Sequence, residues 1–455
     1  MKKTAFLIFV ITIYSASLSF AQSDSLTLTL DKAIKIALSR NTNLIKNKNN
    51  LLMKKASVKS AYGEFLPNMN FSASWRWNKI KDNGGEQLDY LGNVITTPPS
   101  EEDSRNYSLG INGSWTLFDG LSNFSNLKKS KKELKAAELE LEKLKQDIVL
   151  QTEMLFIDVI KNEYLLNVRK ENVKYNQKFL ETIEEKHKLG SVPVADLYSQ
   201  QVQLGNAELA LIQAQNNYDN AKLKLLDYLA LDVNKNYKFE SGLNGKEIST
   251  NIDSIMQPID ELVNYALQSR PDFKSKKLAV EIAQENLTMA KSGYFPRLTG
   301  SYGLGTSAAG VNKLFNRKTF NAGLNLSFPI FSNFRTSEQV QYAKVGELNA
   351  KEDLTAYERK IKVEIRQAYD KLLAAKKGVE VSRKTVLAAK ETRTTVKQKY
   401  DMGSATIVEV LKADKDYQDA LSNQIEAINV FLVQKQSLLN AIGKLDYRKY
   451  EVSSK

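Results

Sequence analysis

Four segments of the chain alternate between apolar and polar residues with a period of two. In the first, odd positions such as Phe71 and Trp75 are apolar, whereas the even positions between them are polar. This period places apolar side chains on one face of a β-strand and polar side chains on the other. The pattern therefore predicts four amphipathic strands, at about 68–78, 106–118, 297–306 and 319–331.

Aromatic residues gather on the apolar face of these strands. They are Phe71, Trp75, Trp77, Tyr107, Trp115, Tyr302, Phe320 and Phe328. Segments of about ten alternating residues, rich in aromatics, are typical of transmembrane β-barrels. A soluble antiparallel sheet with one buried face gives the same pattern. Small polar residues on the opposite face favour a water-filled lumen, so we predict that the aromatic face contacts outer-membrane lipid.

Two segments predict very long helices. Residues 121–189 contain neither Gly nor Pro, and residues 334–402 contain no Pro, so nothing obliges either segment to break. At 1.5 Å per residue, each makes a rod of about 100 Å. Apolar residues that recur every seven positions from Leu127 indicate coiled-coil packing. The natural partners are shorter predicted helices at about 31–62, 194–230, 259–292 and 405–442.

The chain contains two copies of one pattern. The segment 31–38 resembles 260–267, and 110–118 resembles 323–331. Each copy runs helix, strand, strand, long helix, tight turn, shorter helix, so the predicted fold is mainly α with β. We expect a first repeat at 22–231, a connector at 232–257, a second repeat at 258–443 and a C-terminal tail at 444–455. An insertion between 67 and 110 would enlarge an external loop.

The N-terminus and composition indicate export. Residues 1–21 combine Lys2 and Lys3, an apolar run and small residues before Gln22, the layout of a secretory signal peptide. No later stretch approaches the roughly 18 apolar residues that a membrane-spanning helix needs, so any membrane crossing is expected to use strands. The chain has no cysteine, and its net charge of +13 is spread along helices, so no nucleic-acid partner is expected.

The residues carry no recognisable catalytic or cofactor chemistry. The single histidine, His187, sits near a predicted helix end and is interpreted as a polar residue of that end. The chain shows neither a phosphate-binding glycine loop nor a spacing of metal ligands. We therefore expect no enzymatic activity, no cofactor and no metal.

Four strands do not close a barrel. Known single-chain membrane barrels start at eight strands, and an open sheet edge in lipid leaves backbone groups without hydrogen bonds. Subunits would have to pool their strands, and two, three or four copies would give eight, twelve or sixteen. The alternative is a periplasmic coiled-coil scaffold or adaptor without a barrel, which would leave the four amphipathic strands unexplained.

The chain resembles the TolC-type outer-membrane efflux proteins. The resemblance is carried by the duplicated layout and by the helix-to-strand junctions Leu66-Pro67 and Phe295-Pro296. It is also carried by two tip sequences, at 188–197 and 400–411. It implies a homotrimer in which a twelve-stranded outer-membrane barrel continues into a long periplasmic α-helical barrel. It also implies two partners, a periplasmic adaptor and an inner-membrane pump of RND or ABC type, which make the trimer the exit duct of a tripartite efflux or type I secretion system.

The resemblance further suggests which residues form the periplasmic tip. It places Leu189, Gly190, Ser191, Met402, Gly403 and Ser404 where the adaptor docks. The two glycines have a simpler interpretation as left-handed helix C-caps, and both interpretations can hold together.

The family's gate can be carried over only in part. Asp196 and Glu409 match acidic positions near the constriction, where a ring of carboxylates would favour cations. In better-known members a tyrosine at the position of Tyr400 and an arginine at that of Ala405 tie the tip to an acid at the position of Asp196. Here Ala405 removes the arginine, and Lys412 stands where a second acid is usual. The latch could instead be rebuilt through Lys412 and Glu409.

Overall fold

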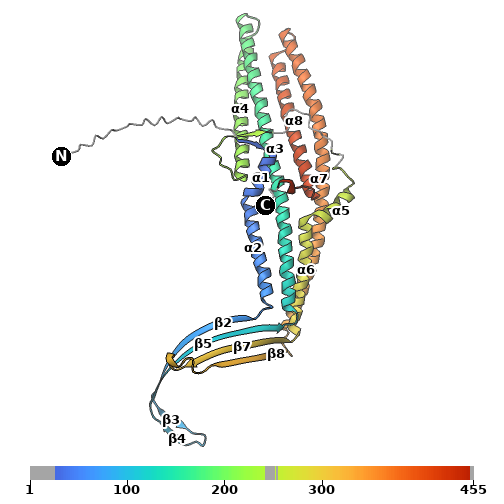
Figure 1. Ribbon diagram of the computed structural model, residues 1–455. Coiled ribbons are helices and arrows are strands. Elements are labelled where there is room, and N and C mark those ends of the chain that lie inside the picture. Colours follow the sequence, from blue (N-terminus) through green and yellow to red (C-terminus); the bar gives the residue numbers. More distant parts are fainter. Residues whose placement is uncertain (1–25, 241–251, 253–254, 451–455) are drawn as a thin grey trace, which may run out of the picture.

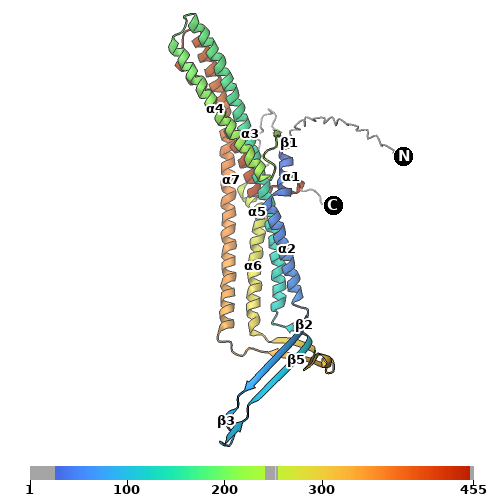
Figure 2. The same cartoon turned by 90° about the vertical axis from the view of Figure 1, so that its left-hand side faces the viewer.

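The computed structural model describes residues 26–240, 252 and 255–450 (Figure 1). The predicted signal peptide at 1–21 lies outside the described residues. The molecule is elongated, with helices along one axis, a four-stranded sheet at one end and two helix–turn–helix tips at the other (Figures 1 and 2). The predicted fold class, mainly α with β, is confirmed.

Two helices of equal length form the body. They are α3, Ser122–Lys188, and α7, Arg335–Asp401, each of 67 residues, so each is about 100 Å long. Beyond the middle of the molecule, α3 packs against α4, Val194–Tyr228, and α7 against α8, Ile407–Ala441. Each pair is an antiparallel coiled coil that ends in a tip turn.

The other half of each long helix packs against a helix pair, where we had expected one continuous helix. The first pair is α1, Leu30–Arg40, and α2, Thr42–Gly63; the second is α5, Ile259–Ser269, and α6, Pro271–Lys291. Asn41 breaks the first because its side-chain oxygen accepts hydrogen bonds from the backbone N–H groups of Asn43 and Leu44, at 3.0 and 3.2 Å. Pro271 starts α6 at its first turn, where a missing N–H is harmless.

The apolar core lies at the waist, where these breaks occur. In the first repeat, fully buried Ile34 of α1 packs with Val159 of α3 and Leu225 of α4. In the second, Leu262 of α5 packs with Ile365 of α7 and neighbouring residues of α8. A parallel ribbon of β1, Leu26–Thr29, and β6, Tyr237–Glu240, completes the waist. The short 3₁₀ turn Arg448–Tyr450 brings the C-terminal segment onto the first cluster.

The sheet is antiparallel, in the order β2-β5-β7-β8 (Figure 1). Its strands are β2, Asn68–Asp82; β5, Ser100–Phe118; β7, Arg297–Ala308; and β8, Thr319–Ser327. Short 3₁₀ turns precede β7, at Ser292–Tyr294, and follow it, at Val311–Lys313.

One end of each strand differs from the predicted range, and β7 runs two residues past 306, to Ala308. β2 runs on past 78, and β5 starts before 106. Between them the chain forms a small hairpin of β3, Gly85–Leu88, and β4, Val94–Thr97. Charged residues face each other across this extension, such as Lys81 opposite Glu101, and Lys79 forms an ion pair with Glu101. The apolar alternation that predicts strands is therefore absent there. β8 ends at Ser327, because Pro329 cannot donate to the ladder. Phe328 therefore lies outside the strand.

None of the described helices has the length and apolar content needed to cross a membrane.

Candidate functional site

Both tip turns are closed by the same backbone motif. After α3, the N–H of Ser191 donates to Lys186 O at 2.8 Å and the N–H of Gly190 donates to His187 O at 2.8 Å. After α7, Ser404 and Gly403 donate to the equivalent carbonyls at 2.8 and 3.0 Å. This Schellman motif requires a left-handed residue, and Gly190 and Gly403 have φ of +69° and +75°. The predicted role of both glycines as helix caps agrees with this geometry.

All six residues predicted for the docking tip are exposed on these turns. The largest apolar side chains among them, Leu189 and Met402, are 80% and 74% exposed. Open space surrounds both glycines, since a Cβ built at either would meet nothing within 4 Å. His187 Nδ1 lies 3.0 Å from Val192 O and so bridges its turn.

A hydrogen bond joins the two coiled coils just behind the tip. Tyr400 Oη, at the end of α7, donates to Asp196 Oδ2, at the start of α4, at 2.9 Å. The ring of Tyr400 is buried against Phe179 of α3 in an edge-to-face contact of 6.0 Å. Burial and the bond to Asp196 raise the pKa of Tyr400 above its ordinary value, so the phenol stays protonated and donates. The structure thus brings together the two residues for which we predicted a gate contact.

An ion pair reinforces this contact. Lys186 Nζ of α3 lies 2.9 Å from Asp401 Oδ1 of α7 and 5.3 Å from the centroid of the Tyr400 ring. Beneath it, Phe179, Ile183 and Ile407 form a small buried cluster with Tyr400. The tip therefore has its own core, separate from the waist.

The other two predicted gate residues do not form the suggested pair. Glu409 makes a capping box instead: its Oε2 accepts from the N–H of Thr406 at 2.7 Å, and Thr406 Oγ1 accepts from the N–H of Glu409 at 3.3 Å. The backbone hydrogen bond from Thr406 lowers the pKa of Glu409. Within the described ranges, Lys412 forms no ion pair with Glu409, although both are exposed. The carboxylate of Glu409 caps the start of α8 and so does not pair with Lys412.

At the other end, the strand registers place the aromatic residues on one face of the sheet. Phe71 is opposite Ile111, which is opposite Leu304 and then Phe320. Trp75 faces Tyr107, and Trp115 faces Gly300. The reverse face holds rows of small polar residues, such as Asn70, Asn112, Gly303 and Asn321.

Tyr302 depends on a glycine on the neighbouring strand. Its hydroxyl crosses Gly113 to donate to Asn68 O at 2.9 Å. A Cβ at Gly113 would lie 2.3 Å from the Tyr302 ring, so only glycine fits beneath it. On the same face, Trp115 Nε1 donates to Phe65 O at 2.9 Å. Both aromatic side chains are thereby fixed at the end of the sheet nearest the helices.

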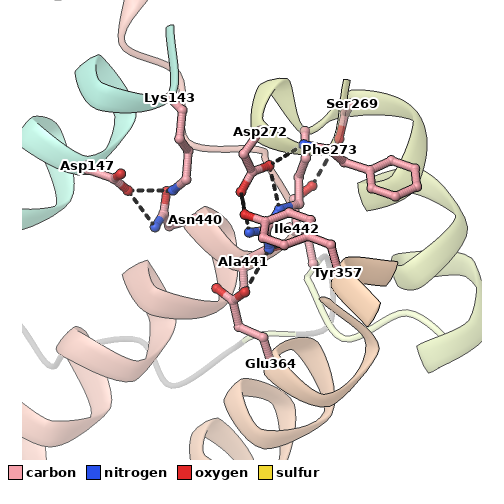
Figure 3. A network of polar contacts seen from close by, with 11 residues as sticks. Lys143, Asp147, Ser269, Asp272, Phe273, Tyr357, Glu364, Asn440, Ala441 and Ile442 are labelled. Atoms are coloured by element: carbon pink, nitrogen blue, oxygen red, sulfur yellow. Dashed lines mark hydrogen bonds and ion pairs between the residues drawn. The ribbon is translucent and has the colours of Figure 1, made fainter. Parts of the chain in front are cut away.

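A charged network stabilises the break between α5 and α6 (Figure 3). Buried Arg270 donates to both carboxylate oxygens of Asp272 at 3.1 and 2.7 Å, to Glu364 at 3.1 Å and to Ala441 O at 2.8 Å. Tyr357 also donates to Asp272, at 2.9 Å. Burial opposes the charge of Asp272, but the bonds from Arg270 outweigh it and lower the pKa of that carboxyl. The network caps the C-terminus of α8 on α7.

No group of three or more possible metal ligands converges within the described ranges.

Comparison with known proteins shows to which family the chain belongs. The family described as "Outer membrane efflux protein" matches residues 33–231 and 262–444, which is most of the chain. The chain belongs to the outer membrane efflux protein family. The outer membrane protein TolC of Vibrio cholerae serotype O1 is 22% identical over 395 residues, covering 86% of this chain and 84% of that protein.

Solved structures of outer membrane proteins have the same fold. The CmeC outer membrane channel of Campylobacter jejuni superposes with a TM-score of 0.76 at 20% identity, over 92% of this chain and 88% of CmeC. The outer membrane protein VceC of Vibrio cholerae gives a TM-score of 0.76 at 17% identity, over 91% of this chain and 96% of VceC.

Membership of the efflux family confirms the predicted function and location. The protein is an outer-membrane efflux channel with a periplasmic portion, so the scaffold without a barrel is set aside. Sequence reasoning missed a polar cluster on the waist side of the tip, around Arg393 and Asp414. Its only signal is that a basic and an acidic residue occupy inward-facing positions of α7 and α8.

Proposed function

We propose that this chain is one of three identical subunits of an outer-membrane exit duct that opens at its periplasmic tip. The observation that carries the proposal is the sheet. It has an apolar face, a polar face and two edge strands, β2 and β8, each of which is paired on one side only among the described residues. Open edges in lipid leave several kcal/mol of unmet hydrogen bonding per group. Three copies joined β2 to β8 give twelve strands and no edge.

The aromatic face has the dimensions of a membrane-facing surface. Trp115 lies about ten residues along β5 from Arg105, which pairs with Trp77, a distance of roughly 34 Å along the strand. At a tilt of about 40° this spans roughly 26 Å, close to the apolar band of outer-membrane barrels. Lipid contact with Phe71, Trp75, Tyr107 and their neighbours would leave the small polar face lining the lumen.

The tips supply the docking surface and the gate. Exposed Leu189 and Met402 and the two glycine turns offer an adaptor small, accessible contacts. The Tyr400–Asp196 hydrogen bond holds α7–α8 against α3–α4 in the resting state. An adaptor and an inner-membrane pump would then complete the export path, with the pump selecting the substrate. Glu409 and Lys412, exposed on α8, would set the charge of the entrance.

Subunit assembly tests the proposal directly. The chain has no cysteine, so one cysteine introduced on β2 and one scanned along β8 give a disulfide only across a subunit boundary. We expect a cross-linked trimer in outer membranes, extracted only by detergent. A cysteine on β5, which is paired on both sides within the chain, is the matched control for β2. A monomer that stays dissolved in plain buffer would refute the proposal.

A further inference from the structure

A second set of polar contacts joins all four helices, on the waist side of the Tyr400–Asp196 contact. It lies seven residues, or about two helical turns, from Tyr400 along α7. Asp414 of α8 and Asn176 of α3 are each 1% exposed, and Gln200 of α4 is fully buried. Arg393 of α7, with 18% of its side chain exposed, completes the set.

An ion pair lies at the centre of this set. Arg393 Nη2 is 2.8 Å from Asp414 Oδ1. Both residues belong to the α7–α8 coiled coil. The pair therefore joins the two helices of one hairpin and does not by itself hold the two hairpins together.

Residues of α3 contact both charged groups of the pair. Asn172 Nδ2 donates to the second oxygen of Asp414 at 3.2 Å. The guanidinium of Arg393 stacks 3.7 Å from the centroid of the Tyr175 ring, a cation–π contact. These two contacts cross from one hairpin to the other. They are made by adjacent turns of α3, so they would break together.

Helix α4 is tied to the same turns of α3. Gln200 Nε2 donates to the backbone oxygen and to the side-chain oxygen of Asn176, both at 3.0 Å. The contacts thus run from α4 through α3 to α8 and α7. A movement of α7–α8 away from α3–α4 has to break the Asn172 and Tyr175 contacts.

Breaking them is unfavourable because Asp414 is deeply buried. Burial raises the pKa of Asp414, although Arg393 opposes this. A buried charge that loses a partner is destabilising. Position 405, where the family resemblance would place a latch arginine, is alanine here.

We propose that the Arg393–Asp414 pair and its contacts with Asn172 and Tyr175 are a second constraint on opening, independent of the Tyr400–Asp196 contact. The inference rests on the proposed tip-gated channel. Its residues act by positioning helices and do not touch the exported substrate. Opening then requires two separations, one at the tip and one about two helical turns closer to the waist.

Single-channel recording of the purified full-length protein in planar bilayers tests this. Asn172→Ala removes the cross-hairpin hydrogen bond to Asp414. The matched control is Asn162→Ala on the same helix, whose side chain donates only to Asp158 O within α3, at 2.8 Å. Because a hydrogen bond to a charged group is lost, Asn172→Ala should raise the ratio of open to closed time roughly tenfold. Asn162→Ala should match the wild type.

The same comparison in a Tyr400→Phe background separates the two constraints. We expect the open-to-closed ratio of the double variant Asn172→Ala, Tyr400→Phe to exceed that of either single variant. If Asn172→Ala and Asp414→Asn leave the open-to-closed ratio of each background unchanged while Tyr400→Phe alone opens the channel, the second constraint is wrong and the tip gate stands. Should Asp414→Asn fail to assemble, Asn172→Ala decides alone. Wild-type protein that never conducts would remove the proposed channel, and the inference with it.

Discussion

Glu153 should make the stability of the waist depend on pH. This glutamate lies on α3 inside the first core cluster and is only 6% exposed. Its Oε2 has no hydrogen-bond partner among the described residues. Burial raises the pKa of Glu153 from 4.5 to about 7, against the opposing attraction of Lys449. Glu153→Gln keeps the shape of the side chain and removes its titration.

The sign follows from proton binding. Between pH 4.5 and about 7 the folded protein holds a proton on Glu153 that the unfolded chain has lost. The free energy of unfolding therefore falls as the pH rises through this window and levels off above it. A pKa difference of this size corresponds to about 3 kcal/mol per subunit. Glu153→Gln should abolish that fall, and so be more stable than the wild type at pH 8 and similar to it at pH 5.

Thermal unfolding in detergent at a fixed scan rate measures the effect. Because unfolding of such an assembly is expected to be irreversible, apparent midpoints are compared between variants and not converted to free energies. Glu171→Gln, at an exposed position of the same helix, is the control and should follow the wild type. Equal pH slopes for the wild type and Glu153→Gln would refute the assignment of a buried, late-titrating carboxyl.

Three further predictions concern the tip and the waist. Gly190→Val or Gly403→Val should spare trimer assembly but abolish drug export by intact cells, because valine is strained at positive φ; Gly205→Val, in the interior of α4, should export normally. Tyr400→Phe should raise the open-to-closed ratio in planar bilayers about tenfold or more, since a hydrogen bond to a carboxylate is lost, and unchanged gating would exclude the contact from the latch. Arg270→Met should lower the apparent midpoint of thermal unfolding, because it leaves the largely buried carboxylate of Asp272 without its partner; a melting curve equal to the wild type would contradict this.

The long helices and the sheet were readable because their signals are local. A stretch of 67 residues with no proline leaves α3 no reason to end, and apolar alternation marks strands wherever one face meets lipid or a core. The breaks at Asn41 and Arg270 were missed, since an asparagine or an X-Pro step within a helical pattern only shows as a cap once the neighbouring helices have fixed the angle.

The candidate site was readable to a lesser degree. The family resemblance pointed to Tyr400 and Asp196, and the structure joins them. It also pointed to Glu409, whose carboxylate caps the start of its own helix, a role that the resemblance did not indicate. The Arg393–Asp414 cluster could not be foreseen, because whether a charge on a coiled coil is solvated or buried depends on which helix packs over it.

The outer parts of β2 and β5 extend past β7 and carry the β3–β4 hairpin (Figure 1). In the proposed duct, with Trp77 at the lipid boundary, this ribbon would be the first part of the protein that antibodies, phages and proteases meet on an intact cell. Its described strands bond to one another and not to β7, so changes of length there leave the pairing of β7 and β8 untouched. An epitope placed in the hairpin would let channels be counted on living bacteria.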